Sequence, residues 1–527
     1  MHSTERYPHG QPNEGGAIAP IAHEQGRDLL AWFCFIATFA FYLLSIEVKS
    51  DGQLLGNDAL PYAYQLANGM PGGLFNAAHL LFHPLVLGIA KLLAYLPAFE
   101  FNELTVLFAQ QCLSAAGGAL SVVMVLRFAK RCAGRSAGIW IAAIYACCYS
   151  NWLYSAVGET YAPATAFVAV LLVQAAEVRL GWRRENVLAL TGWLFLAVCL
   201  RQDSVLVICA LPFLLQPKTS LTVIGASGAL AFLFYVTAWS MADLDQPFVS
   251  WLRNLSEADI WGNAPTFESL SLATGLIAAS IHSGIIHLHQ AFAGRMEWSS
   301  LSIWSAILSI SVLGMLSLLP SERTRATKTV LAGFALYFVV RFGFFTWWQP
   351  ANLEFHNGTL LPVTLIAVLL LRSNVRRMPT WPLPLAFVLI AVGNLTAFVL
   401  PNRAMAVSLD TATAVEAVGP GGMIVALNAN QYHALLREPP SNVTVVDGVD
   451  IFVRNNLERL PALMETIQTH IESGKPVMLL RELGIWSRMG FPERPINMTA
   501  IDKLVPLYRS RPLLNDEGDP WALILEP

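Results

Sequence analysis

The chain has 527 residues, of which 55% are hydrophobic and 13% are charged, and its mean hydropathy is +0.51. Soluble domains carry about 25% charged residues, so the composition excludes an ordinary soluble protein and indicates a polytopic α-helical membrane protein. A net charge of -3 excludes a nucleic-acid partner, because a polyphosphate backbone requires a basic surface.

The N-terminal residues 1–28 are polar and precede an apolar run with no small-residue cleavage site after it. We therefore expect a cytoplasmic tail and an uncleaved first membrane helix. All seven cysteines lie before residue 210, so no disulfide framework supports the later segments outside the membrane.

The first loop, residues 50–69, contains the candidate catalytic residue, Asp58. The spacing of Tyr62, Leu66 and Gly69 predicts a short amphipathic helix on the membrane surface, with Asp58 near its start. A helix N-terminus favours the ionised carboxylate that a base requires. Aspartate is also a common helix cap, so a purely structural role stays open. Asp51 is the competing carboxylate, although Gly52 and the lack of a directly following helix leave it unsupported.

Apolar runs of about 17 to 25 residues can cross a bilayer, and they recur along the first 400 residues. The longer runs cover 29–46, 104–126, 136–154, 160–178, 221–240, 300–319, 329–346 and 381–400. Three shorter runs cover 187–200, 204–215 and 358–371. Together they predict about eleven spanning helices.

Lys and Arg residues gather in five clusters, and cytoplasmic loops are enriched in such residues. The clusters are Arg127/Lys130/Arg131/Arg135, Arg179/Arg183/Arg184, Lys218, Arg323/Arg325/Lys328 and Arg372/Arg376/Arg377. One topology alone places all five inside, with the N-terminus inside and the C-terminus outside. It requires that residues 79–96 form a half-buried helix along the outer face, and a simple crossing of this run is the alternative.

Two histidines begin that run. His79 and His83 are four residues apart, so on one helix they would share a face and could bind a metal or a phosphate. Interfacial histidines that hydrogen-bond to the loop are the alternative. Farther along the exterior, residues 270–292 predict a helix that lies on the surface.

Three further charged residues fall near the outer side. Glu159 lies at a membrane boundary, where an acidic group needs solvent or a partner, and a helix cap is its alternative role. Arg201 breaks a long apolar stretch and could receive an anionic phosphate, unless it and Asp203 merely neutralise each other as a turn. Arg341 is a second such cation, which could instead extend to lipid headgroups.

A polar segment follows the tryptophans at 347–348. An aromatic belt at the membrane surface explains the tryptophans, but it does not explain Asn352 and Glu354 directly behind them. Both join the candidate site.

From residue 401 the composition becomes that of a soluble protein. Residues 424–427, 443–446, 477–480 and 522–525 predict short buried strands, and 456–472 predict an amphipathic helix. We expect three regions: a polar tail at 1–28, a transmembrane domain at 29–400 and a small extracytoplasmic α/β domain at 401–527.

Across residues 29 to 400 the chain resembles the integral-membrane glycosyltransferases of the GT-C class, which include protein O-mannosyltransferases and the aminoarabinose transferase of lipid A. The resemblance depends on an ordered set of features. These are the first helix, the loop with Asp58, Tyr62 and Ala67, the segment His79 to Pro84, the basic turn Arg127 to Arg135, Glu159, the break at Arg201 and the tryptophan-proline segment at 347–350.

The resemblance implies a GT-C-like fold in the inner membrane and a sugar that arrives on a polyprenyl phosphate. An inverting transfer follows, in which Asp58 takes or orients the proton of the acceptor hydroxyl. Arg201 and Arg341 would offset charge on the departing phosphate. Glu159 would act as a second carboxylate, or with Asp58 as a ligand of a divalent metal. His79, His83, Tyr62, Asn352 and Glu354 are the remaining candidates for supporting the site or binding the acceptor.

The sequence departs from the familiar members in two respects. No second acidic residue stands beside Asp58, and no clear Asp-x-Asp follows the third spanning helix, which puts dependence on a metal in doubt. The acceptor, whether lipid, glycan or protein, is left open. A multi-pass transporter or a non-catalytic scaffold of envelope assembly is the alternative function.

Overall fold

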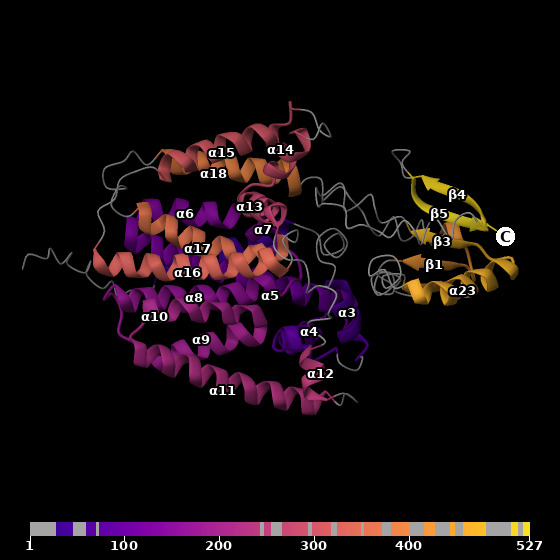
Figure 1. Ribbon diagram of the computed structural model, residues 1–527, viewed down its shortest axis with the longest axis horizontal. Helices are drawn as coiled ribbons and strands as arrows, with labels where there is room; N and C mark the ends of the chain where they lie inside the picture. Colours follow the sequence, from indigo (N-terminus) through magenta and orange to yellow (C-terminus); the bar gives the residue numbers. More distant parts are fainter. Residues whose placement is uncertain are drawn as a thin grey trace, which may run out of the picture.

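A computed structural model describes residues 28–45, 59–69, 73–242, 247–253, 266–292, 298–317, 324–348, 353–371, 381–399, 416–426, 443–447, 457–480, 507–514 and 520–526. Within these ranges the chain forms a large group of helices up to residue 399 and a small β-sheet with one α-helix after it (Figure 1).

The first half of the helical part runs from the N-terminus to the break at Arg201. Its elements are α1 (Leu29–Ser45), α3 (Ala59–Ala67), the 3-10 helix η1 (Ala77–His79), α4 (Phe82–Leu93), α5 (Glu103–Ala133), α6 (Arg135–Cys147), α7 (Tyr149–Ala156), α8 (Tyr161–Arg179) and α9 (Val187–Leu200).

The second half begins directly after Arg201. It comprises the 3-10 helix η2 (Gln202–Ala210), α10 (Leu211–Leu214), α11 (Pro217–Met241), α12 (Phe248–Arg253), α13 (Phe267–Ile281), α14 (Gly284–Phe292), α15 (Leu301–Ser317), α16 (Arg325–Trp348), α17 (Leu353–Leu371), α18 (Pro382–Asn394) and a π-helical turn (Leu395–Val399).

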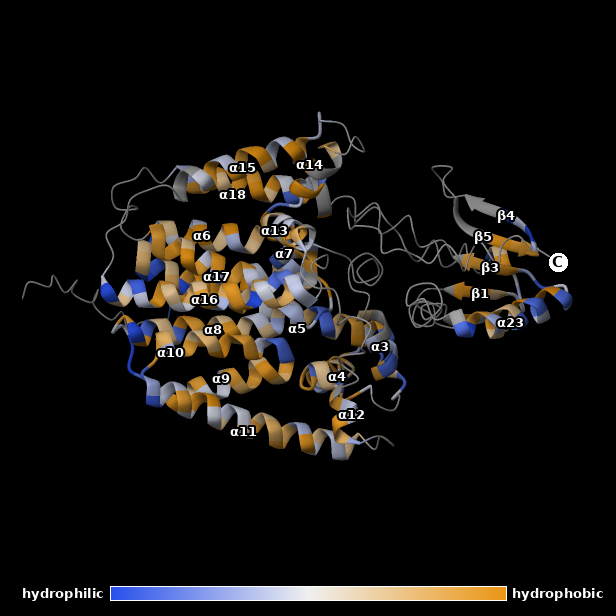
Figure 2. Cartoon of the chain, in the orientation of Figure 1, coloured by the Kyte–Doolittle hydropathy of each residue, from blue (hydrophilic) through white to orange (hydrophobic). Residues whose placement is uncertain are grey.

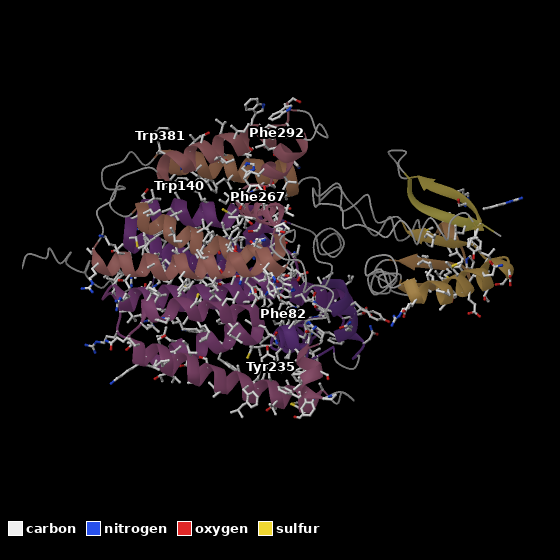
Figure 3. All side chains as sticks on the ribbon, in the orientation of Figure 1. Phe82, Trp140, Tyr235, Phe267, Phe292 and Trp381 are labelled. Carbon is white, nitrogen blue, oxygen red and sulfur yellow. The ribbon has the colours of Figure 1, made fainter. Side chains whose placement is uncertain are left out.

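Four of the described helices, α5, α8, α11 and α16, are long and apolar enough to cross a membrane. Large apolar side chains such as Phe33 on α1 and Phe232 on α11 are exposed, and apolar residues dominate the helices in Figure 2. Trp381 before α18 and Phe292 on α14 also lie at the surface, as labelled in Figure 3. Such exposure is unfavourable in water, and contact with lipid removes the penalty.

Helix α5 lies at the centre and packs against α1, α3, α4, α6, α7 and α8. Two consecutive glycines allow its close approach to the end of α7 and the start of α8. A methyl group added at Gly117 would lie 2.6 Å from the Pro163 Cα, and one added at Gly118 would overlap the Ser155 side chain. Helix α5 therefore lies directly against the residues on either side of Glu159, which fixes the position of Glu159 between α7 and α8.

The structure corrects three predicted elements. The apolar run 136–154 is two helices, α6 and α7, because the backbone at Cys148 turns to ψ 136°. The basic residues Arg127 and Lys130 are helical, because α5 continues to Ala133 and ends where Gly134 takes φ 92°. The surface helix at 270–292 is divided into α13 and α14 at His282.

Basic residues at the end of α5 have buried or half-exposed acidic partners. Glu177 on α8 is fully buried and binds Arg127 and Arg131, each at 2.7 Å. Lys130 binds Asp28, just before α1, at 2.7 Å. These ion pairs hold the start of α1 and the ends of α5 and α8 together at one end of the helices.

The C-terminal sheet has the strand order β2-β1-β3-β5-β4 among the described residues. The strands are β1 (Met423–Ala426), β2 (Thr444–Asp447), β3 (Val477–Leu480), β4 (Arg509–Leu514) and β5 (Pro520–Glu526). β1 pairs in parallel with β2 and β3, whereas β5 is antiparallel to β3 and β4. Four strands and the helix α23 (Leu460–Glu472) confirm the predicted elements to within a few residues, and β4 was not predicted. The position of this sheet outside the membrane stays a prediction.

Candidate functional site

The site is centred on one carboxylate that binds two arginines. Asp203 Oδ1 lies 2.7 Å from Arg201 Nε, and Asp203 Oδ2 lies 3.0 Å from Arg341 Nη2. All three side chains are buried. The alternative role, in which Arg201 and Asp203 merely neutralise each other, is incomplete, because Asp203 also binds Arg341 on α16.

Arg201 owes its position to the predicted break. Helix α9 ends at Leu200, and Arg201 takes an extended conformation with φ -161° and ψ 121° before η2 begins. Its guanidinium lies 3.7 Å above the centre of the Tyr161 ring, and its Nη1 donates to Thr160 Oγ1 at 3.2 Å. A charge without partners would be unfavourable within this apolar stretch. Asp203, the Tyr161 ring and the Thr160 hydroxyl together stabilise the Arg201 guanidinium.

Arg341 comes from the interior of α16 and faces α17. Its Nη2 donates to the Phe355 carbonyl at 3.2 Å, and the guanidinium lies 4.8 Å from the centre of the Phe345 ring. A side chain on Gly358 would collide with the guanidinium. Arg341 is buried, so it does not extend to lipid headgroups, and that alternative is wrong.

Glu159 lies in the segment between α7 and α8 and is buried. Its backbone carbonyl accepts a hydrogen bond of 2.7 Å from Ser114 Oγ on α5. The next residue, Thr160, is the one that binds Arg201. Glu159 and the arginine cluster therefore belong to one region of the molecule.

The two histidines do not share a helix. His79 ends η1 and His83 lies in α4, with Leu80 and Leu81 between the two helices. The expected common helix face is wrong, yet both rings meet the Tyr62 ring of α3, at centroid distances of 6.1 Å and 4.5 Å. Helix α4 has 12 residues, and its course along the outer face stays a prediction.

Hydrogen bonds tie η1 and the start of α4 to the break at Arg201. Gln202 Nε2 donates to the Ala77 carbonyl at 2.9 Å, and the Leu81 amide donates to the Cys199 carbonyl at 2.8 Å. The hydroxyl of Tyr235 on α11, labelled in Figure 3, also donates to the Ala77 carbonyl, at 3.1 Å. These bonds hold η1 beside the segment that contains Arg201 and Asp203.

Both histidines have lowered pKa values. Burial lowers the pKa of His83 to about 4, although its hydrogen bond to the Gly73 carbonyl acts in the opposite direction. Burial, and then the positive charge of Arg201, hold the pKa of His79 well below its usual range. Both imidazoles are therefore neutral at neutral pH.

Several predicted site residues are outside the described part of the chain. Asp58 and Asn352 lie outside the described residues, and the same holds for the side chain of Glu354, whose backbone belongs to α17. Helix α3 begins at Ala59, directly after Asp58, as predicted. Among the described residues no group of three or more His, Cys, Asp or Glu side chains could hold a metal. A metal bound by Asp58 and Glu159 stays a prediction.

Comparison with known proteins bears on the fold. No protein-family model and no curated protein sequence matches the chain. Among solved structures, the chain is similar to ArnT from Cupriavidus metallidurans bound to undecaprenyl phosphate, with a TM-score of 0.52 and 11% identity. The similarity covers 94% of this chain and 98% of ArnT. The chain has a GT-C-like fold. The apo structure of the same ArnT is also similar, with a TM-score of 0.39, 12% identity and the same coverage.

Within the GT-C-like fold, sequence reasoning missed two features of the site. The second partner of Asp203 was missed, because nothing in the sequence links residues 203 and 341. Thr160 and Tyr161 were missed as partners of Arg201, although their position beside Glu159 was a usable signal.

Proposed function

We propose that the protein transfers a sugar from a polyprenyl phosphate to an acceptor hydroxyl at the outer face of the membrane, with inversion. The observation that carries the proposal is the buried cluster in which two guanidinium groups share one carboxylate. Two cations and one anion leave a positive charge in excess within that cluster, and a buried positive charge favours an anionic ligand. The bound undecaprenyl phosphate of ArnT, the protein with the similar fold, is such an anion.

The arginines suit a phosphate by their chemistry. A guanidinium carries five N–H donors in a planar fork that matches phosphate oxygens. Arg201 and Arg341 are held in place by Asp203, by aromatic rings and by backbone oxygen, so little conformational freedom is lost when a phosphate binds. Their positive charges would stabilise the phosphate as it leaves.

Asp58 is the proposed base. The acceptor hydroxyl attacks the anomeric carbon of the sugar while Asp58 accepts its proton, and the bond from that carbon to the phosphate oxygen breaks with its electron pair on the phosphate. Ala59, the residue after Asp58, lies against Gly158, and Glu159 follows, so the start of α3 adjoins the region of the arginine cluster. Glu159 would act as a second carboxylate.

The contacts at the two ends of α8 support a site at the outer face of the membrane. Tyr161 at the first residue of α8 contacts Arg201, whereas Glu177 in its last turn binds the basic residues of α5. These ends are about 24 Å apart at 1.5 Å per residue, which approaches the thickness of the hydrocarbon layer. Basic residues mark the cytoplasmic end, so the candidate site would lie at the opposite face.

The same placement of basic residues at the cytoplasmic side supports eleven passes through the membrane. We propose that the passes are α1, α5, α6 with α7, α8, α9, η2 with α10, α11, α15, α16, α17 and α18. The N-terminus would be cytoplasmic and the sheet extracytoplasmic.

The test is a transfer assay on the purified protein in lipid nanodiscs, with release of undecaprenyl phosphate from sugar-linked lipids as the readout. Asp58→Asn removes the base but keeps size and polarity, and it should lower the rate at least about 100-fold while lipid binding is unchanged. Asp51→Asn, in the same loop, is the matched control and should retain activity. Undiminished transfer by Asp58→Asn would reject the proposed base, and uptake of a solute by reconstituted protein would support the transporter.

A further inference from the structure

Gln110 on α5 is a buried amide whose two polar atoms have no hydrogen-bond partner in the described structure. Its side chain is 0% exposed, and neither Nε2 nor Oε1 reaches a donor or an acceptor. An amide left unpaired in a protein interior destabilises the folded state, so a Leu or Met would be the better residue for packing alone. A ligand that binds the amide removes this disadvantage.

The amide end of Gln110 lies at the junction of the two segments that carry the candidate carboxylates. A methyl group added at Gly158 would lie 2.8 Å from Gln110 Cβ, 3.0 Å from Gln110 Oε1 and 3.5 Å from the Ala59 Cβ. Ala59 begins α3 directly after Asp58, and Gly158 precedes Glu159. One turn farther along α5, Ser114 binds the Glu159 carbonyl. Gln110 thus occupies the face of α5 that packs on this junction.

The junction also leads to the arginine cluster. Thr160, two residues after Gly158, accepts a hydrogen bond from Arg201. Gln110 therefore lies beside a segment whose one end adjoins the start of α3 and whose other end contacts the proposed phosphate site. In a transfer reaction the sugar occupies the space between the phosphate and the base.

We propose that the Gln110 amide binds hydroxyl groups of the sugar that is transferred, an inference that rests on the proposed function. A neutral amide offers one oxygen acceptor and two N–H donors, which complement a pair of neighbouring hydroxyls. It carries no charge, so it suits a neutral part of the sugar, whereas Arg201 and Arg341 suit the phosphate. Gln110 is accordingly a specificity-determining residue and takes no part in proton transfer.

The test compares two ligands on the full-length protein in nanodiscs. Undecaprenyl phosphate is the probe for the phosphate site, and undecaprenyl-phosphate-linked glucose, N-acetylglucosamine and aminoarabinose are the probes for the sugar. In the unmodified protein at least one sugar-linked lipid should bind more tightly than the bare lipid. Gln110→Leu should reduce that preference about tenfold or more and leave the affinity for undecaprenyl phosphate unchanged.

The Tm values of the variants distinguish sugar binding by Gln110 from a role in stabilising the fold. Gln110→Leu removes an unpaired amide, so its Tm should stay the same or rise, and Gln110→Met, which is unbranched, should behave alike. Gln174→Leu is the matched control, because Gln174 is a buried glutamine on α8 that accepts a hydrogen bond from Trp193 Nε1. This control should lower the Tm and leave the preference for the sugar intact.

Each contrary result has its own meaning. A preference retained by both Gln110 variants, a fall in their Tm values, or no preference in the unmodified protein would overturn the role of Gln110 alone. Failure of the unmodified protein to bind undecaprenyl phosphate would overturn the proposed function and this inference together.

Discussion

Asp203 and Arg341 form a buried ion pair, with Arg341 Nη2 3.0 Å from Asp203 Oδ2 and side-chain exposures of 6% and 5%. Asp203 belongs to η2 and Arg341 to α16, so the pair links two elements that are far apart in the sequence. Asp203 binds Arg201 at the same time. The pair therefore holds both proposed phosphate ligands in one place.

Asp203→Asn should destabilise the protein by about 3–5 kcal/mol, because it leaves two buried guanidinium groups without their carboxylate. The Tm measured by thermal unfolding checks this. Undecaprenyl phosphate should raise the Tm of this variant more than that of the unmodified protein, because the ligand replaces the lost negative charge.

Asp28→Asn is the control for that variant. The Asp28 and Lys130 side chains are 45% and 27% exposed, so this ion pair should contribute less than about 1 kcal/mol. Equal effects of the two substitutions would contradict a special role of the Asp203 cluster.

Arg341→Gln should weaken the binding of undecaprenyl phosphate about 10- to 100-fold, since hydrogen bonds to charged groups contribute about 1.5–3 kcal/mol. Arg341→Lys keeps the charge but loses the planar fork, so its loss should be intermediate. Titration of the lipid into nanodiscs provides the measurement.

Arg131 on α5, which binds Glu177 in the last turn of α8, is the control for Arg341. Arg131→Gln removes an ion pair with Glu177 and should lower stability without changing lipid affinity. Weaker lipid binding in both variants would indicate a general loss of folding rather than a phosphate site.

The free energy of unfolding should decrease in acid because of His83. The folded-state pKa of His83 is lowered to about 4, below the value near 6.5 in the unfolded chain. The unfolded state therefore binds the proton first, so the contribution of His83 is fully present above pH 6.5 and declines as the pH falls toward 4, by about 3 kcal/mol.

Comparison with His83→Gln checks this assignment. The Tm of the variant should depend less steeply on pH between 6.5 and 4.5 than the Tm of the unmodified protein. Parallel curves would show that other groups cause the acid sensitivity.

Gly117→Ala should destabilise the protein by about 1–3 kcal/mol, because the added methyl would lie 2.6 Å from the Pro163 backbone and α5 would have to move. Gly192→Ala on α9 is the control, since no atom lies within 4 Å of a methyl there. This control should be neutral or stabilising by up to about 1 kcal/mol. Similar Tm values for both variants would contradict the close packing of α5 on α8.

Much of the helical framework was predictable, because lipid contact selects long apolar runs. The run 160–178 corresponds to α8, and the run 221–240 lies inside α11. The interruption at Arg201 was predicted because a charged residue cannot continue an apolar helix without a partner. Errors came where the chain stays apolar across a break, as at Cys148, since hydropathy carries no information about backbone direction.

The candidate site was predictable only in part. The start of α3 after Asp58 followed from local spacing. The non-crossing course of α4 was inferred from the positions of the basic clusters and stays a prediction. The expected common face of His79 and His83 was wrong, because two residues between η1 and α4 interrupt the helix. Even so, the fold brings both rings to Tyr62.

The sequence by itself determined that the chain is an integral-membrane protein and where most of its helices and strands lie, because those features depend on the polarity and spacing of near neighbours. The tertiary structure alone decided which charges meet. Asp203 binds Arg341, and Gln110 faces Gly158, because helix packing brings together residues that have no local relationship. Ion pairs and buried amides act over a few ångströms, so only the three-dimensional arrangement can assign their partners.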